Sequence, residues 1–482
     1  MHSGMMEMDI LQILPELILA LGAMLVLLIG AFRGNFATIL LCRAAMVVYV
    51  IAALYLLVPE WTDRVVINGL FVLDGFAGFI KLFILIGMLA AMGLSIGYLR
   101  EEGMARFEYP VLMLTATLGM LMMVSANDLL AMYLGLELQS LSLYILTAMK
   151  RDSLRSAEAG MKYFVLGAIS SGMILFGASL IYGYTGTTNY AGIAEAIAAS
   201  NGLYIGALFG LVFILAGLAF KVSAVPFHMW TPDVYEGAPT PVTAMFAMVP
   251  KIAAMALAAR LLLEAFGTVT EAWTQIIALL SLASMTWAAL AGLVQSNIKR
   301  LMAYSSIGNM GYAMLGLLAA NPEGVGATFF YMGIYMVMTA GAFGVILCMR
   351  RNNLATEAID DLAGLSQNMP ALAYAMAIFM FSMSGVPPFA GFFAKFTVFK
   401  AAVGQGYYIL AVIGVITSVI AAYYYLRIIK LMFFDSAADP YDKGVAFARR
   451  AVIMIAAIVI VGFVAMPNML IDSTRAAAQS LF

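Results

Sequence analysis

The stretch Gly217-Leu-Ala-Phe-Lys-Val-Ser-Ala-Val-Pro-Phe-His-Met-Trp-Thr-Pro-Asp-Val-Tyr-Glu-Gly-Ala-Pro-Thr-Pro241 decides the fold. It begins as the end of a long apolar run that contains Lys221, and Pro226 and His228 follow shortly afterwards. An ammonium group at bilayer depth costs at least about 2.5 kcal/mol even on the mildest scale. A chain that keeps a lysine in such a place is expected to use it.

The composition predicts an all-α polytopic membrane protein. Of the 482 residues, 64% are hydrophobic and 11% are charged, whereas a soluble domain carries about 25% charged residues. The apolar residues extend over the whole chain, without the short alternating strands of a membrane barrel. A net charge of -1 argues against a nucleic-acid partner.

The chain offers few ligands for a cofactor. Cys42 and Cys348 lie far apart in apolar runs, and His2 and His228 are the only histidines. These residues do not suffice for an iron–sulfur cluster or a two-histidine haem, and the sequence has no P-loop or convincing dinucleotide fingerprint. We therefore expect no cofactor in this chain.

Runs of about 20 apolar residues are long enough to cross a bilayer. The sequence contains about fourteen, joined by loops too short for a soluble domain, and 191–199 is expected to form a short interfacial helix. The predicted spans are 11–32, 37–58, 73–99, 107–125, 128–149, 157–184, 203–222 with a continuation to 235, 240–263, 272–294, 299–320, 325–349, 371–403 with a break, 407–433 and 447–469.

Basic residues in the loops predict the orientation, because cytoplasmic loops of membrane proteins are rich in Lys and Arg. With both termini outside, only Arg64, Arg260, Lys400 and Arg475 fall on the outer side. The inner side then receives Arg33, Arg43, Arg100, Arg106, Lys150, Arg151, Arg155, Lys299, Arg300, Arg350, Arg351, Arg427, Lys430, Lys443, Arg449 and Arg450.

Two spans are interrupted near their middle and suggest an inverted repeat. Lys221 precedes Ser223 and Pro226 in one, whereas Lys395 follows the break at Ser382-Met-Ser-Gly-Val-Pro-Pro388 in the other. Paired broken helices in two halves of a chain are typical of inverted-repeat transporters. We therefore expect two five-helix repeats, at 107–265 and 266–434, between an N-terminal three-helix segment (1–106) and a C-terminal helix (435–482).

The candidate site consists of ionisable residues within these spans. Glu137 is the carboxylate near the centre of a span, and Lys221 is its expected partner. Lysine can take up and release a proton, whereas arginine stays charged, so Lys221, Lys251 and Lys395 favour a proton relay. A static ion pair that fixes helix packing is the alternative interpretation for Glu137.

Three further residues leave alternatives open. His228 is suited to proton shuttling but equally to a structural hydrogen bond. Lys162 lies about a turn inside its span, where it can serve the relay or extend to the inner surface. Lys81 is expected to extend to the outer surface, away from the relay.

Several motifs resemble the antiporter-like membrane subunits of respiratory complex I (NADH–quinone oxidoreductase), which are similar to Mrp-type cation/proton antiporters. The resemblance covers nearly the whole chain and rests on the opening motif, on Gly135-Leu-Glu-Leu-Gln-Ser-Leu-Ser-Leu-Tyr144, on Asn297-Ile-Lys-Arg-Leu-Met-Ala-Tyr-Ser-Ser-Ile307 and on Ser384-Gly-Val-Pro-Pro-Phe-Ala-Gly-Phe-Phe-Ala-Lys-Phe396. It implies a polar axis through Glu137, Lys221, Lys251 and Lys395, with Lys162 near its entrance. Asn309 departs from the pattern, because many relatives have histidine there, and asparagine does not exchange protons as histidine does.

The resemblance also implies a function and partners. The chain would move protons across a bacterial inner membrane, driven by quinone reduction elsewhere in the complex. Its partners would be membrane lipid and other complex I membrane subunits, including antiporter-like siblings, while flavin and iron–sulfur clusters would lie in partner subunits. The alternatives are a subunit of a multisubunit sodium/proton antiporter and a structural membrane spacer that moves nothing.

Overall fold

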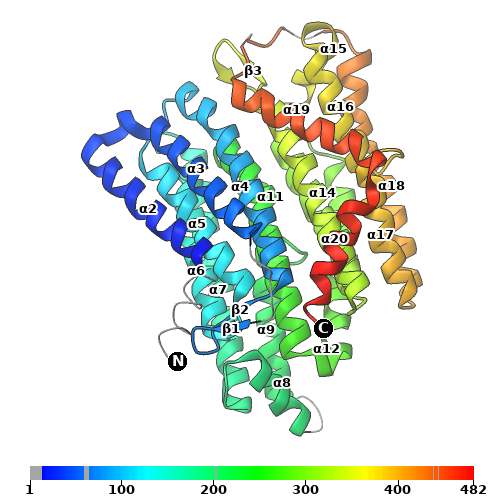
Figure 1. The fold of residues 1–482 in the computed structure, drawn as a ribbon. Helices are drawn as coiled ribbons and strands as arrows, with labels where there is room; N and C mark the ends of the chain where they lie inside the picture. The colour runs from blue at the N-terminus through cyan, green and yellow to red at the C-terminus, as the bar shows by residue number, and fades with distance from the viewer. Residues whose placement is uncertain (1–12, 59–63, 201–203, 438, 443) are drawn as a thin grey trace.

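The fold is a bundle of long helices, seen in a computed structural model that describes residues 13–58, 64–200, 204–437, 439–442 and 444–482 (Figure 1). The predicted all-α architecture is confirmed. The longer helices are α2 (Leu14–Arg33), α3 (Thr38–Leu56), α4 (Gly75–Glu101), α5 (Glu108–Ser125), α6 (Leu129–Thr147), α7 (Leu154–Thr185), α9 (Ile205–Val222), α11 (Thr240–Arg260), α12 (Thr270–Gly292), α13 (Ile298–Leu317), α14 (Pro322–Ile346), α16 (Pro370–Ser384), α17 (Ala390–Gly404), α18 (Tyr408–Phe434), α19 (Phe447–Gly462) and α20 (Pro467–Gln479).

Every predicted span overlaps one of these helices, but the count of fourteen stays a prediction. By length and composition, 11 stretches of the described residues can cross a membrane. The stretch Leu14–Leu56 among them contains both α2 and α3, and neither α13 nor the short helices of the broken span qualify singly. The last predicted span is too long, because α19 ends at Gly462 and Pro467 begins the separate helix α20.

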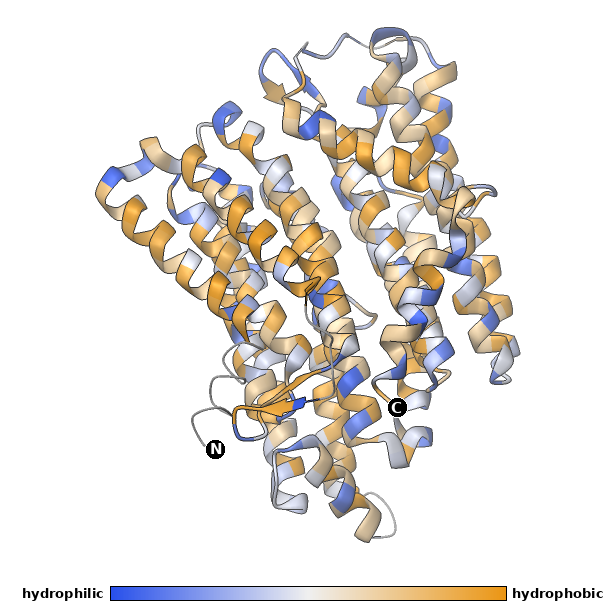
Figure 2. Ribbon diagram, in the orientation of Figure 1, coloured by the Kyte–Doolittle hydropathy of each residue, from blue (hydrophilic) through white to orange (hydrophobic). Residues whose placement is uncertain are grey.

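Helices α11 and α14 form the centre of the bundle. Every residue of α11 is buried, and nearly every residue of α14 is buried too. A helix that is apolar all round belongs in a protein interior. Helices α2 and α3 instead expose many large apolar side chains along their outer faces, as expected of a surface in contact with lipid (Figure 2).

Small residues let neighbouring helices touch backbone to backbone. A Cβ atom added at Gly119 in α5 would lie 2.5 Å from the backbone nitrogen of Gln139 in α6, and one at Gly135 would lie 2.9 Å from that of Met123. Such contacts suit a membrane interior, where van der Waals packing takes the place of a hydrophobic driving force between helices. They fix α6, which carries Glu137, against α5.

The two predicted breaks are present and share a geometry. Ser223 with φ +64° directly follows α9, and Gly385 with φ +85° directly follows α16, so both helices are terminated by a residue in the left-handed conformation. The chain resumes as the short helix α10 (Thr231–Gly237) after the first break and as α17 after the second. The order of lysine and break is opposite in the two segments, as the sequence indicates.

The loops contain more regular structure than the sequence predicts. Two antiparallel hairpins pair β1 (Arg64–Val66) with β2 (Phe71–Leu73) and β3 (Arg350–Arg351) with β4 (Leu354–Ala355). The expected short helix in the loop after α7 is α8 (Tyr190–Ala199). The strands escape sequence analysis because each has only two or three residues.

Candidate functional site

Lys221 lies in the last turn of α9 and is buried. Its Nζ donates a hydrogen bond to Ser140 Oγ at 2.8 Å and lies 5.9 Å from the centre of the Tyr144 ring. Both partners belong to α6. The backbone of the break is held by side chains, because Trp230 Nε1 donates to the Phe220 carbonyl at 3.0 Å.

Glu137 is half-buried on the same face of α6 as Ser140, one turn earlier. No ion pair joins it to Lys221 within the described parts of the chain, and Glu137 Oε1 is buried without a hydrogen-bond partner there. The expected direct pair is therefore not formed in this structure. Ser140 receives the lysine, one helical turn from the carboxylate.

Lys251 follows Pro250 inside α11 and is 1% exposed. Its Nζ donates to Ser306 Oγ of α13 and lies 5.6 Å from the centre of the Tyr235 ring. Ser306 is also within 3.5 Å of the Tyr235 hydroxyl. The second lysine thus has a hydroxyl partner, as Lys221 has.

Lys395 lies in α17 beside the second break and is buried. Its Nζ donates to Ser418 Oγ at 2.7 Å and to the Ser384 carbonyl at 3.2 Å. It also lies 5.1 Å from the centre of the Tyr312 ring. All three lysines therefore have a hydroxyl partner and an aromatic ring, and no ion pair holds any of them in the described structure.

Buried hydroxyl groups gather around Asn309, on the helix that also carries Ser306. Ser305, next to Ser306, shares a hydrogen bond of 2.5 Å with the Tyr425 hydroxyl. Asn309 donates to the Ser305 carbonyl at 2.7 Å and accepts from the Tyr331 hydroxyl at 2.5 Å. The residue that replaces the expected histidine is therefore part of a hydroxyl cluster. The spacing of Ser305, Asn309 and Tyr312, on one face of a helix, is the signal that was available in the sequence.

Tyr312 extends this face of α13 toward the second break. Its hydroxyl lies 3.4 Å from Thr417 Oγ1, on the helix that carries both Ser418 and Tyr425. Helices α13 and α18 thus present facing polar side chains over two turns, from the cluster beside Lys251 to the partner of Lys395.

Lys162 extends to the surface, in keeping with one of its two interpretations. Its side chain is 43% exposed and pairs with Glu158 and with Asp233, each at 2.8 Å. Arg300 pairs with Asp233 at 2.8 Å and with Glu236 at 2.9 Å. These charges line a small polar cavity of about 240 Å³ beside α10.

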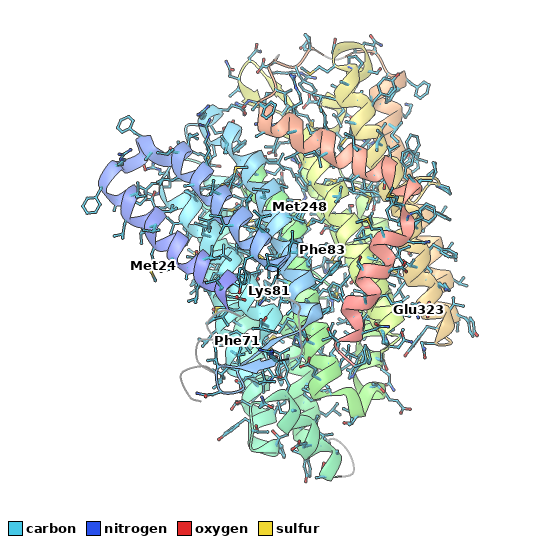
Figure 3. The ribbon with its side chains drawn as sticks, viewed as in Figure 1. Met24, Phe71, Lys81, Phe83, Met248 and Glu323 are labelled. Atoms are coloured by element: carbon cyan, nitrogen blue, oxygen red, sulfur yellow. The ribbon has the colours of Figure 1, made fainter. Side chains whose placement is uncertain are left out.

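The position of Lys81 contradicts the prediction that it extends to the outer surface. Lys81 is instead fully buried, at the position labelled in Figure 3. Its Nζ lies 2.6 Å from Glu16 Oε1 of α2. Arg260, predicted for the outer loops, is also fully buried and pairs with Asp74 at 2.8 Å. In both cases a carboxylate distant in sequence makes burial possible.

Lys299, predicted as a surface charge, is 2% exposed. Its Nζ donates to the carbonyls of Glu236 at 2.7 Å and Ala238 at 2.8 Å, where α10 ends. It borders a polar cavity of about 710 Å³ that Glu102 also lines. Burial alone would raise the pKa of Glu102, but hydrogen bonds from Lys150 and Arg350 outweigh it and hold that pKa below its usual range.

His228 is half-buried in the first break. Its ring packs edge-on against Trp287 with 6.0 Å between ring centres, and its Nδ1 is buried without a hydrogen-bond partner among the described residues. His228 is not a hydrogen-bond partner of Lys221, Lys251 or Lys395. In the same described ranges, no three His, Cys, Asp or Glu side chains gather as metal ligands would.

The broken helices and the buried lysines are the features of an antiporter-like membrane protein. Comparison with known families agrees, since the NADH:quinone oxidoreductase/Mrp antiporter transmembrane family matches residues 126–421. A chain of respiratory complex I from Thermus thermophilus with bound aureothin has a TM-score of 0.81 at 32% identity, over 95% of this chain and 98% of that one. A chain of the Mrp complex from Dietzia sp. has a TM-score of 0.85 at 22% identity, which shows the fold alone.

Two similar proteins identify one family within this class of antiporter-like membrane proteins. NADH-quinone oxidoreductase subunit N of Parvibaculum lavamentivorans is 53% identical over 98% of both chains. That of Rhodospirillum rubrum is 52% identical over 97% of this chain and 96% of its own. The chain belongs to the NADH-quinone oxidoreductase subunit N family.

Proposed function

We propose that this chain carries protons across the bacterial inner membrane as part of NADH–quinone oxidoreductase, through Glu137, Lys221, Lys251 and Lys395. One observation carries the proposal. Each of the three lysines is buried, and each donates to a serine hydroxyl. A carboxylate in place of that hydroxyl would form a fixed ion pair with the lysine. Protons would enter from the inner side and leave outside, driven by quinone reduction in partner subunits.

The contrast with Lys81 supports this assignment. Lys81 is equally buried, but its Nζ forms an ion pair with the Glu16 carboxylate at 2.6 Å. A hydroxyl group both donates and accepts hydrogen bonds, so a lysine bound to one can exchange a proton with it. Lys81 is therefore assigned to packing, and Lys221, Lys251 and Lys395 to transfer.

The hydroxyl cluster around Asn309 offers a route between the second and third lysines. A proton leaving Lys251 would pass to Ser306, then through a bridging water molecule to the hydrogen-bonded hydroxyls of Ser305 and Tyr425, and through further water toward Tyr312. Asn309 holds the tyrosine hydroxyls in place and does not itself carry the proton. Lys162 and His228 have supporting roles, the former at the entrance beside the cavity at Asp233.

The proposed assembly follows from family membership. The partners are other complex I membrane subunits, antiporter-like siblings and lipid, and the flavin and iron–sulfur clusters belong to other subunits. The repeats span 107–265 and 266–434, with 1–106 and 435–482 outside them and both termini on the periplasmic side.

Lys221→Ala tests the proposal in membrane vesicles that contain the assembled complex. Proton pumping coupled to NADH oxidation is expected to fall at least tenfold while assembly persists. Lys400→Ala is the matched control, because Lys400 is 66% exposed and pairs with Glu323 at the surface. Full pumping with normal quinone-linked turnover in Lys221→Ala would refute the relay.

The likeness to the Mrp complex keeps a sodium/proton antiporter subunit as the second candidate. The antiporter alternative predicts that a sodium gradient drives proton movement without NADH. It also predicts that this chain copurifies with other membrane subunits only. The spacer alternative predicts unchanged activity when each of the four relay residues is replaced in turn.

A further inference from the structure

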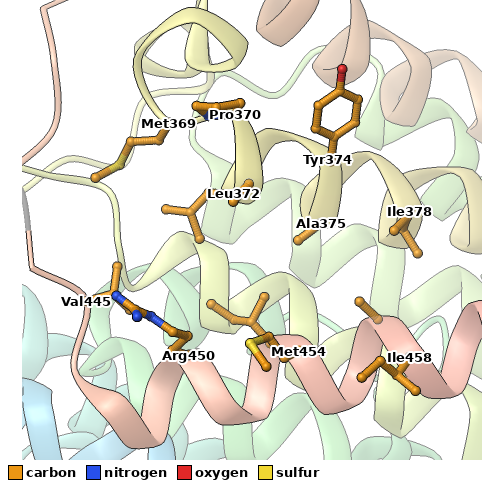
Figure 4. Close-up of a pocket in the computed structure, with 13 residues that line it drawn as sticks. Met369, Pro370, Leu372, Tyr374, Ala375, Ile378, Val445, Arg450, Met454 and Ile458 are labelled. Carbon is orange, nitrogen blue, oxygen red and sulfur yellow. The ribbon is translucent and has the colours of Figure 1, made fainter.

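An apolar groove of about 650 Å³ lies between α16 and α19, away from the lysine axis (Figure 4). Its walls are apolar over their length, and its volume falls within the usual range of small-ligand sites. The residues that line it include Met369, Leu372 and Ile378 on one side and Ile453, Met454 and Ile458 on the other.

One end of this groove is electropositive. Arg450 lies there, exposed, beside Val445 (Figure 4). Across the described residues its side chain has no ion pair, whereas its neighbour Arg449 is buried and paired with Glu101 at 3.0 Å. One arginine of the pair is thus used inside the protein, and the other is left facing outward.

Two helices also begin at this end. Helix α16 starts at Pro370 and α19 at Phe447, and neither start has a side-chain cap. The positive end of a helix dipole favours an anion at both starts. At α16, Pro370 has no N–H group and the Leu372 N–H donates to the Met369 carbonyl at 3.1 Å, so α19 offers more free N–H groups than α16. The groove therefore combines a cationic end with an apolar body.

We propose that this groove binds an anionic phospholipid of the membrane. The phosphate would contact the Arg450 guanidinium at the starts of α16 and α19, and an acyl chain would lie along Ile378 and Ile458. A neutral quinone would leave the Arg450 guanidinium without an anionic partner. A helix from another subunit would need a carboxylate beside Arg450 to pair with its charge. Basic pockets between membrane helices are known to favour anionic head groups.

Photo-crosslinking tests the site in the full chain, purified with the subunits that accompany it. The probe is phosphatidylglycerol with a diazirine in one acyl chain, and phosphatidylcholine with the same chains is the comparison. Crosslinked peptides are mapped by mass spectrometry. We expect crosslinks on α16 and α19, at least about fivefold more with phosphatidylglycerol than with phosphatidylcholine.

Two variants separate the head group from the acyl chain. Arg450→Glu is expected to remove the preference for phosphatidylglycerol, and Ala457→Phe, which fills the groove, to reduce crosslinking by both lipids. Arg43→Glu and Ala31→Phe, at exposed positions on α3 and α2, serve as controls. Equal crosslinking by both lipids, an unchanged preference in Arg450→Glu, or recovery of another subunit's peptide at this groove would overturn the proposal.

Discussion

Gly391, at the start of α17, is the position where a single methyl group should do most damage to the second half. A Cβ atom there would lie 1.9 Å from the Ser382 carbonyl oxygen, where ordinary contact begins at 3.4 Å. Helices α16 and α17 would have to separate by about 1.5 Å. The hydrogen bond from the Gly391 N–H to Ser382 Oγ, now 3.0 Å, would then be lost.

Overpacking costs about 1–3 kcal/mol and the hydrogen bond about 1 kcal/mol, so Gly391→Ala should lower the free energy of unfolding by about 2–4 kcal/mol. Lys395 lies one turn further along α17, and its bond to the Ser384 carbonyl would lengthen with the same movement. Proton pumping is therefore expected to fall together with stability.

The matched control is Gly404→Ala at the other end of α17, where an added Cβ meets nothing within 4 Å. It should be neutral or stabilising by up to about 1 kcal/mol, since alanine favours a helix over glycine. Thermal unfolding of the purified assembly followed by intrinsic fluorescence gives the stability, and vesicle acidification gives the pumping rate. If both variants unfold at the wild-type temperature and pump normally, the close approach at Gly391 is not a constraint.

Three further outcomes are expected. Lys81→Met should destabilise the bundle by about 3–5 kcal/mol, because it strands the buried Glu16 carboxylate, and the double variant with Glu16→Gln should recover part of the loss in thermal unfolding. Glu102→Gln should lower the unfolding temperature at pH 7, because the folded pKa of Glu102 lies below its unfolded value of about 4.3. The difference in unfolding temperature from wild type should shrink as the pH falls from about 4.3 to below the folded pKa. A difference that does not change with pH would contradict the lowered pKa of Glu102. Tyr425→Phe should slow proton pumping severalfold without affecting assembly, whereas Tyr408→Phe, 63% exposed on the same helix, should pump normally; equal rates would exclude the hydroxyl route.

Sequence patterns predict the helices well because a bilayer demands long apolar runs. They also locate Lys221, Lys251 and Lys395, since each interrupts such a run, and the two breaks, since proline and small residues mark them. These features depend on neighbouring residues, so a single sequence contains what is needed to find them.

Features that depend on distant residues escape this kind of prediction. The sequence predicts a surface position for Lys81, because nothing in it links this lysine to its partner Glu16 on another helix. The sequence predicts Lys299 on the inner side at the start of a span, but the end of α10 covers it. The hydroxyl partners of the lysines, Ser140, Ser306 and Ser418, are not predictable because serine is common in this chain. The cluster of Ser305, Asn309 and Tyr425 likewise depends on contacts between α13 and α18.

The second break has an electrostatic consequence that no side chain controls. The carbonyl that accepts from Lys395 belongs to Ser384, the last residue of α16. A helix end carries about half a negative charge, spread over its unpaired carbonyls. The backbone thus serves as a partial counter-ion for Lys395. Point mutation of Ser384 would leave it in place, whereas insertion of a residue that straightened the break would remove it.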